Sequence, residues 1–173
     1  RGGRGARHAG VLDAVGNAWA GRVWWLRRYV GHDAVSVLEG GLGAWKAAGV
    51  AVASGPGDIE AVAAAPRPTV TPDIRPHLLA TTAEVAATLP GVEGVAQEAR
   101  GTVVVNALDP ATFAGTSEMS PYARRGRIPG SVNLPLVTLL DPATGRFLPV
   151  PELAGKLQAQ GVLDAERAVT YCG

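Results

Sequence analysis

Short apolar segments with the composition of β-strands alternate with segments of helical spacing, and this alternation constrains the fold more than any other feature of the sequence. Residues 34–38 (AVSVL), 102–106 (TVVVN) and 168–171 (AVTY) are rich in β-branched side chains. Residues 18–29 repeat apolar side chains at near-helical spacing, and Gly31 follows them. Strands that alternate with helices in this way predict an α/β fold built on parallel sheets.

The same pattern predicts the remaining elements. We expect a strand that ends near Asp13 and Asn17 as the cap of the first helix, because Asn is a favoured N-cap residue. Asp109 and Asp141 each precede a proline and are predicted to form turns. The further expected elements are helices over 42–48, 82–89 and 151–160 and a short strand around Val132.

A change of composition divides the chain. Residues 54–80 are rich in Pro, Gly and Ala, which is typical of an extended linker. We therefore predict part of one domain over residues 1–53, a linker over 54–80 and part of a second domain over 81–173. The chain begins with Arg1 and ends at Gly173, directly after a predicted strand, so we expect it to be a fragment of a longer protein.

Composition narrows the classes of function. The chain has 173 residues, 47% of them hydrophobic, and a formal net charge of +1, which gives no overall attraction to nucleic acid. No apolar run reaches the roughly 18 residues of a membrane span. The single cysteine excludes an internal disulfide and fits a reducing cytoplasm. Neither a metal-ligand spacing nor a glycine-rich phosphate loop is present, so we expect no metal and no nucleotide.

Cys172 is the first candidate for chemistry. It lies one residue beyond a predicted strand and precedes Gly173. Ligands of α/β sheets bind at the carboxyl ends of the strands. A thiol at that position can be surrounded by backbone N–H groups, which stabilise a thiolate and an anion bound on it. The alternative is a small buried side chain without chemical function, as most free cysteines are.

A basic cluster is the second candidate. Arg124, Arg125 and Arg127 stand beside a tight turn at 128–130 (IPG). Guanidinium groups bind anions with directed hydrogen bonds, so the cluster could attract an anionic substrate. The alternative is a solvated basic loop. A nucleic-acid patch is less well supported, because no series of aromatic side chains accompanies the arginines.

Four segments together resemble a known family. They are WAGRVWWLRRYVGHDAVSVLEGGLGAWKAAG at 19–49, GRIPGSVNLP at 126–135, PELAGKLQAQGV at 151–162 and AVTYCG at 168–173. They are similar to the tandem-domain rhodaneses, the thiosulfate and 3-mercaptopyruvate sulfurtransferases. The resemblance implies two rhodanese-like domains, each a parallel sheet flanked by helices and each incomplete here. It further implies that the first domain is inactive, with Asp13 where the second has Cys172.

The chemistry of that family follows from the resemblance. The Cys172 thiolate would take the outer sulfur of thiosulfate, sulfite would leave, and the persulfide that remains on Cys172 would pass its sulfur to cyanide or a thiol. No cofactor or metal would be needed, and Gly173 would contribute a backbone N–H to the site. We expect thiosulfate as the donor, with 3-mercaptopyruvate as the alternative. Because the loop after Cys172 would lie beyond the chain, we expect these 173 residues alone to be inactive.

The sequence departs from the family pattern in two places. The family's Asp-x-Arg near the end of a strand reads Asn106-Ala107-Leu108 here, so the arginine is replaced, and Arg124 or Arg125 could substitute for it. The family's His before Ile-Pro-Gly is Arg127. Two other functions therefore stay open. One is a non-catalytic rhodanese-like binding module, and the other is a related phosphatase with a longer loop that ends in Arg.

Overall fold

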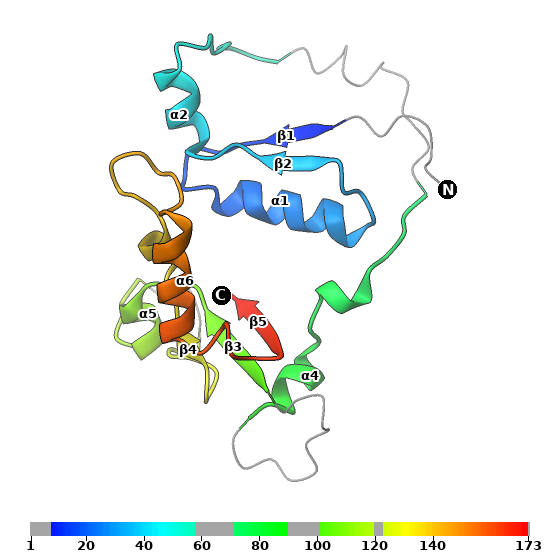
Figure 1. The fold of residues 1–173 in the computed structure, drawn as a ribbon, viewed down its shortest axis with the longest axis vertical. Coiled ribbons are helices and arrows are strands. Elements are labelled where there is room, and N and C mark those ends of the chain that lie inside the picture. The colour runs from blue at the N-terminus through cyan, green and yellow to red at the C-terminus, as the bar shows by residue number, and fades with distance from the viewer. Residues whose placement is uncertain (1–7, 58–70, 90–100, 120–122, 173) are drawn as a thin grey trace. The chain divides into compact units, whose positions relative to one another are not determined.

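The computed structural model describes residues 8–57, 71–89, 101–119 and 123–172. The chain divides into two compact units, with unit 1 spanning Arg1–Leu78 and unit 2 spanning Leu79–Gly173. Each unit contains parallel strands with helices beside them (Figure 1). The predicted α/β class with parallel sheets is therefore confirmed.

Unit 1 is a β-α-β arrangement followed by a second helix. Strand β1 (Ala9–Val11) pairs in parallel with β2 (Val35–Val37), and α1 (Ala18–Tyr29) connects them. Helix α2 (Gly41–Ala47) follows β2. The predicted bounds of the first helix agree with α1, because its apolar spacing and the glycine that follows it are both local signals.

The start of α1 differs from the prediction. Asn17 has a left-handed backbone with φ 63°, its side chain makes no capping hydrogen bond, and its buried Oδ1 has no hydrogen-bond partner. The Asp13 carboxylate instead accepts hydrogen bonds from the N–H groups of Trp19 and Ala20, each at 2.9 Å. The prediction that Asn17 caps this helix is therefore wrong, because the turn after β1 brings Asp13 back over the helix start.

Unit 2 is built on a three-stranded parallel sheet in the order β4-β3-β5. Strand β3 lies in the middle, and its Val104 and Val105 are among the buried core residues, together with Leu134. The run of β-branched residues in this strand fits a strand covered on both faces. The strands are β3 (Thr102–Asn106), β4 (Val132–Asn133) and β5 (Arg167–Tyr171).

The helices of unit 2 begin with recognisable caps. Thr81 and Glu84 form a reciprocal capping box, and the Asp109 carboxylate accepts a hydrogen bond from the Thr112 N–H at 2.9 Å. Asp109 therefore starts a helix, and the prediction of a simple turn there is wrong. Asp141 does form the predicted turn.

The helices of unit 2 are α4 (Thr82–Ala86), α5 (Pro110–Ala114) and α6 (Val150–Ala159). Two short 3-10 helices are also present among the described residues, η1 (Pro76–Leu78) in unit 1 and η3 (Leu136–Leu139) in unit 2.

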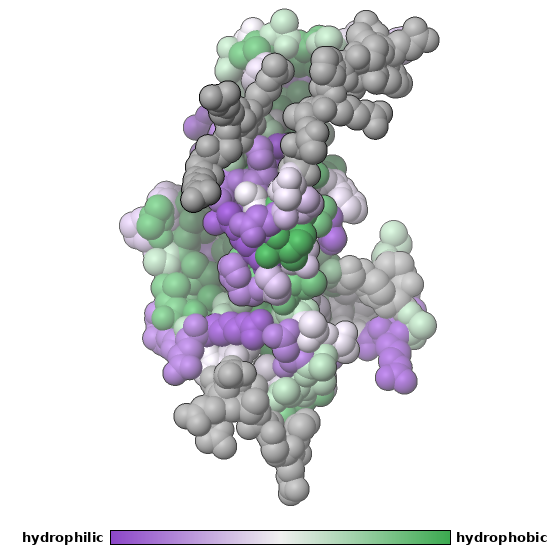
Figure 2. Space-filling view, turned by 90° about the vertical axis from the view of Figure 1, so that its right-hand side faces the viewer, coloured by the Kyte–Doolittle hydropathy of each residue, from purple (hydrophilic) through white to green (hydrophobic). Residues whose placement is uncertain are grey.

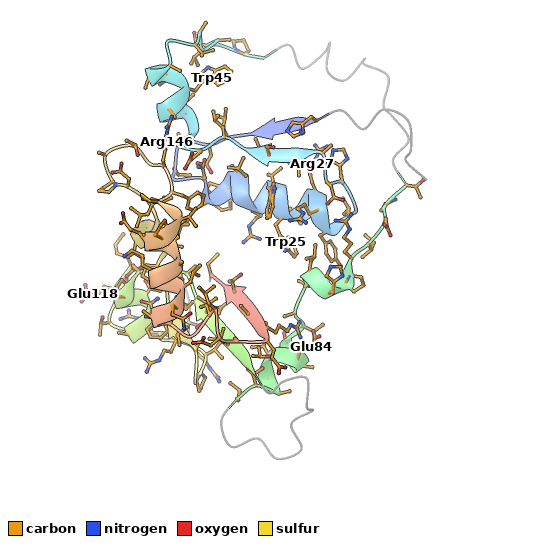
Figure 3. All side chains as sticks on the ribbon, viewed as in Figure 1. Trp25, Arg27, Trp45, Glu84, Glu118 and Arg146 are labelled. Carbon is orange, nitrogen blue, oxygen red and sulfur yellow. The ribbon has the colours of Figure 1, made fainter. Side chains whose placement is uncertain are left out.

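Apolar side chains are prominent at the surface. Figure 2 shows hydrophobic residues, in green, beside hydrophilic ones in purple. Trp19 is 65% exposed and Val150 is 77% exposed. Trp25, labelled in Figure 3, lies on α1, and its ring stacks on that of Tyr29 with centroids 5.3 Å apart. Within the described residues, no helix is long and apolar enough to cross a membrane.

Candidate active site

The three strands of unit 2 end at one edge of the sheet. Asn106 at the end of β3 is in register with Asn133 at the end of β4 and with Tyr171 at the end of β5. All three strands are parallel, so their carboxyl ends meet at this edge. Cys172 is the residue after Tyr171, and its thiol is therefore presented where ligands of α/β sheets bind.

Cys172 itself is exposed and carries a free thiol. The N–H of Ala107 donates to the carbonyl oxygen of Tyr171 at 3.0 Å, so the pairing of β3 with β5 continues up to the cysteine. Figure 1 shows β5 as the arrow that ends beside the C-terminus. The catalytic role of Cys172 stays a prediction.

The side-chain amides of Asn106 and Asn133 hold the chain where it leaves β3, the middle strand of the sheet. Asn106 is 1% exposed, and its Oδ1 accepts a hydrogen bond from the Leu108 N–H at 2.9 Å. The Asn133 Nδ2 donates to the carbonyl oxygen of Leu108 at 2.9 Å and lies 3.4 Å from the Asn106 Oδ1. These bonds hold the chain in a fixed path as it leaves β3, since buried amides need partners.

Tyr171 connects β5 to the turn before β4. Its hydroxyl oxygen accepts a hydrogen bond from the Ile128 N–H at 3.1 Å and lies 3.0 Å from the Ser131 Oγ. The Ser131 hydroxyl donates to the carbonyl oxygen of Ile128 at 2.7 Å, and Ser131 is buried. The turn that follows the basic cluster is therefore attached to the residue next to Cys172.

The predicted substrate-binding residues have different surroundings. The guanidinium carbon of Arg127 lies 4.7 Å from the centre of the Phe113 ring, a cation–π contact with α5. Arg124 and Arg125 are exposed in the loop before β4. Gly173 lies outside the described residues. Substrate binding by these four residues stays a prediction.

Unit 1 has an ionised group at the corresponding edge of its own sheet. Asp13 follows β1, and its carboxylate accepts four backbone hydrogen bonds at 2.8–2.9 Å. The donors are the N–H groups of Val15, Asn17, Trp19 and Ala20. Burial by itself would raise the pKa of Asp13, but these four donors outweigh it and hold the pKa below the ordinary 3.8. A ring of backbone N–H groups can thus hold an anion at this edge.

The sequence analysis did not give a role to Tyr171, Ser131 or Asn133. The hydrogen bonds of these residues join positions about forty or more than twenty residues apart, which no local pattern predicts. One signal was available. Tyr171 has a polar end and directly precedes the candidate cysteine, and a half-buried tyrosine hydroxyl usually has a partner.

Several proteins with assigned names are similar to this chain over most of its length. The chain is 31% identical over 179 aligned residues to thiosulfate/3-mercaptopyruvate sulfurtransferase 1, mitochondrial, of Arabidopsis thaliana, covering 94% of this chain and 45% of that protein. It is 32% identical to a probable 3-mercaptopyruvate sulfurtransferase and 29% identical to a thiosulfate sulfurtransferase, both of Pseudomonas aeruginosa. These alignments cover 94% of the chain and 52% and 54% of the two relatives. The chain thus spans about half the length of the relatives it matches.

Solved structures show the same fold. The 3-mercaptopyruvate sulfotransferase of Escherichia coli superposes with a TM-score of 0.69 at 22% identity, over 95% of this chain and 65% of that one. The anaerobic ergothioneine biosynthesis enzyme of Chlorobium limicola superposes with a TM-score of 0.67 at 21% identity, over 88% of this chain and 35% of that one. No family model matches the sequence.

The parallel sheets and the match to a solved structure over 95% of the chain show that this protein has the rhodanese fold. The alignments over nearly the whole chain are more specific than the fold. The chain is a homologue of the thiosulfate and 3-mercaptopyruvate sulfurtransferases, as the resemblance in its motifs implied.

Proposed function

We propose that the protein is a thiosulfate sulfurtransferase in which Cys172 carries sulfur as a persulfide. The observation that supports this most directly is the position of Cys172 at the carboxyl edge of the parallel sheet, directly after Tyr171, which is in register with the end of β3. A nucleophile there follows the strand end that is in register with Asn106, at the edge where ligands of α/β sheets bind, and a cysteine at such an edge can act as a covalent nucleophile.

The reaction has two half-reactions. The Cys172 thiolate attacks the outer sulfur of thiosulfate, the S–S bond of thiosulfate breaks, and sulfite leaves with the electron pair of that bond. Cyanide or a thiolate then attacks the outer sulfur of the persulfide and releases the Cys172 thiolate. The enzyme alternates between two covalent states, so ping-pong kinetics are expected.

3-Mercaptopyruvate is the alternative donor, with pyruvate as the leaving product. Both donors are anions, so Arg124, Arg125 and Arg127 are proposed to bind either of them, together with the backbone N–H of Gly173. Leu108 stands where a family arginine is expected, and the names of the relatives include both donors. The preferred donor is therefore to be determined by comparing thiosulfate with 3-mercaptopyruvate in the same assay.

The domain arrangement and location belong to the same proposal. Residues 1–53 are proposed as part of an inactive rhodanese domain, 54–80 as a linker, and 81–173 as part of the catalytic domain. Asp13 supports inactivity of the first domain, because its carboxylate fills the ring of N–H groups that an anion on a catalytic cysteine would need. The single cysteine favours the cytoplasm.

Intact mass spectrometry of the complete protein tests the proposal. The protein is incubated with thiosulfate and, separately, with 3-mercaptopyruvate, beside a Cys172→Ser variant. We expect a mass gain of one sulfur atom that disappears when cyanide is added and is absent from the variant. The donor that gives the larger yield at equal concentration is the preferred one.

Two results would count against the proposal. A mass gain in the Cys172→Ser variant would assign the chemistry to another group. No gain with either donor in a folded protein would favour a non-catalytic binding module, and Cys172 would then have no role in sulfur transfer. A protein that releases phosphate from a phosphoester and forms no persulfide would instead be a phosphatase.

A further inference from the structure

Tyr171 has a closed set of hydrogen bonds that links the catalytic candidate to the basic cluster. The Ser131 hydroxyl proton is directed to the Ile128 carbonyl oxygen, at 2.7 Å. The contact between the Ser131 and Tyr171 oxygens, at 3.0 Å, is therefore satisfied with the tyrosine hydroxyl as donor. The tyrosine oxygen in turn accepts from the Ile128 N–H at 3.1 Å. Every donor in this set has a partner.

These bonds determine where the turn 128–131 lies in unit 2. The turn is closed by a hydrogen bond from the Ser131 N–H to the Ile128 carbonyl oxygen at 3.1 Å, and Gly130 has a φ of 78°. Ile128 is the residue directly after Arg127. The peptide group that joins Arg127 to Ile128 therefore contacts the end of the Tyr171 side chain, and Tyr171 is covalently bonded to Cys172.

The segment fixed in this way is strongly basic. Residues 123–131 (ARRGRIPGS) contain three arginines and no acidic residue. Arg124, Arg125 and Arg127 have exposed side chains, so their charges face solvent and are available to a soluble anion. A positive segment held close to a nucleophile raises the local concentration of anionic reactants, and the effect weakens as salt is added.

We propose that Tyr171 is a positioning residue whose hydroxyl holds the arginine-bearing segment 123–131 beside Cys172, and that this arrangement selects anionic sulfur donors. The inference rests on the proposed function of Cys172 and adds the determinant of its substrate class. Without the hydroxyl, the Ile128 N–H and the Ser131 hydroxyl lose their shared partner, and the segment loses its attachment to β5.

The rate of alkylation of Cys172 by two reagents tests this placement without sulfur transfer. Iodoacetate is an anion and iodoacetamide is neutral, and both attack the thiolate. The ratio of their rate constants cancels the thiolate fraction and reports the electrostatic potential at the sulfur. The complete protein is used, and alkylation of the peptide that contains Cys172 is followed by mass spectrometry.

We expect Tyr171→Phe to lower the iodoacetate-to-iodoacetamide ratio roughly two- to five-fold, the size of an exposed charge interaction. Added salt should lower the ratio in the unaltered protein and have less effect in the variant. Arg127→Ala should lower the ratio in the unaltered protein and change it little in the Tyr171→Phe background, because the two substitutions act on one arrangement. Tyr29→Phe, in unit 1, is the matched control and should leave the ratio unchanged.

An unchanged ratio in a folded Tyr171→Phe protein would overturn the inference. Equal effects of Arg127→Ala in both backgrounds would overturn it as well, since the arginine would then act independently of the tyrosine. If Tyr171→Phe fails to fold, Ser131→Ala tests the same network, because it keeps the tyrosine and removes its partner. In that variant we again expect a lower ratio.

The outcome is separable from that of the proposed function. A persulfide on Cys172 together with an unchanged ratio in Tyr171→Phe would contradict the role of Tyr171 alone. A lowered ratio in Tyr171→Phe without any persulfide in the unaltered protein would contradict sulfur transfer and support the positioning of the arginines. In a protein that forms the persulfide, Tyr171→Phe should raise KM for thiosulfate more than it lowers kcat.

Discussion

Asp13 is the single residue whose charge most directly supports the start of α1. Its carboxylate accepts hydrogen bonds from four backbone N–H groups, two of them at the beginning of that helix. We expect Asp13→Asn to lower the free energy of unfolding of unit 1 by about 1 kcal/mol at neutral pH, because the amide has one acceptor oxygen and no charge. Denaturation by urea, followed by tryptophan fluorescence, measures this. An equal stability of the two proteins would contradict it.

The same carboxylate predicts a pH dependence. Because the pKa of Asp13 is lower in the folded state than the ordinary 3.8, the ionised form stabilises the fold at pH values above 3.8. That stabilisation is lost as the pH falls through the folded-state pKa. The stability difference between the unaltered protein and Asp13→Asn should therefore shrink on acidification, and a difference that stays constant below pH 3.8 would contradict the assignment.

The start of α1 shows how far the sequence predicts the role of a single residue. Asn17 occupies the expected N-cap position, yet the group that caps α1 is Asp13, four residues earlier. Composition favours Asn and Asp equally as caps, so only the path of the turn decides between them. Cys172 could be proposed from the sequence because its signal, a thiol directly after a predicted strand, is local. Tyr171 was missed because its partners are distant in sequence.

Among the elements, the end of β3 depends on one buried amide. Asn106 is 1% exposed and accepts the Leu108 N–H, and Asn133 donates to the same corner. We expect Asn106→Val to lower the free energy of unfolding of unit 2 by about 1–3 kcal/mol, because it removes the acceptor of the half-buried Leu108 N–H. Thr170→Val, at an exposed site on β5, is the matched control and should change stability little. Equal effects of both substitutions would contradict the role of the amide.

The end of α1 is joined to the segment before η1 by an ion pair. Arg75 makes two hydrogen bonds of 2.6 Å to Asp33, and Arg28 lies 3.5 Å from the same carboxylate. The hydrogen bond from Arg75 is the main cause of the low pKa of Asp33, about 2. We expect Arg75→Gln to raise this pKa toward 3.8 and Arg28→Gln to raise it less, as measured by NMR titration. A larger effect of Arg28→Gln would contradict this order.

The elements themselves were largely predictable. The bounds of α1 and β3 agree with the sequence pattern, because helical spacing and a β-branched run are strong local signals. Helix α5 was missed since Pro110 suggested a turn, although proline is also favoured in the first turn of a helix after an Asp cap. The polar composition of residues 91–101 predicts a loop, and residues 91–100 lie outside the described residues.

At the scale of the whole molecule, the alternation of strands and helices was sufficient to predict the α/β class and the parallel pairing. The order β4-β3-β5 was not, because neighbours in a sheet are chosen by tertiary packing. The motifs that resemble the rhodaneses pointed to the sulfurtransferases of which the chain is a homologue. The predicted domain limits at 53 and 81 stay a prediction, and so does the inactivity of the first domain.

The distribution of tryptophan gives a last prediction on the molecule as a whole. All four tryptophans lie within residues 19–45, in unit 1, and unit 2 contains none. Each unit has its own sheet and its own buried residues, so each is expected to unfold as a cooperative step. In this chain, fluorescence should therefore report unit 1 alone, while far-UV circular dichroism reports both units. Asp13→Asn, in unit 1, should shift the fluorescence transition. Asn106→Val, in unit 2, should shift the circular dichroism transition of unit 2 and leave the fluorescence transition unchanged. Coincident transitions that respond equally to both substitutions would show that the two units unfold as one.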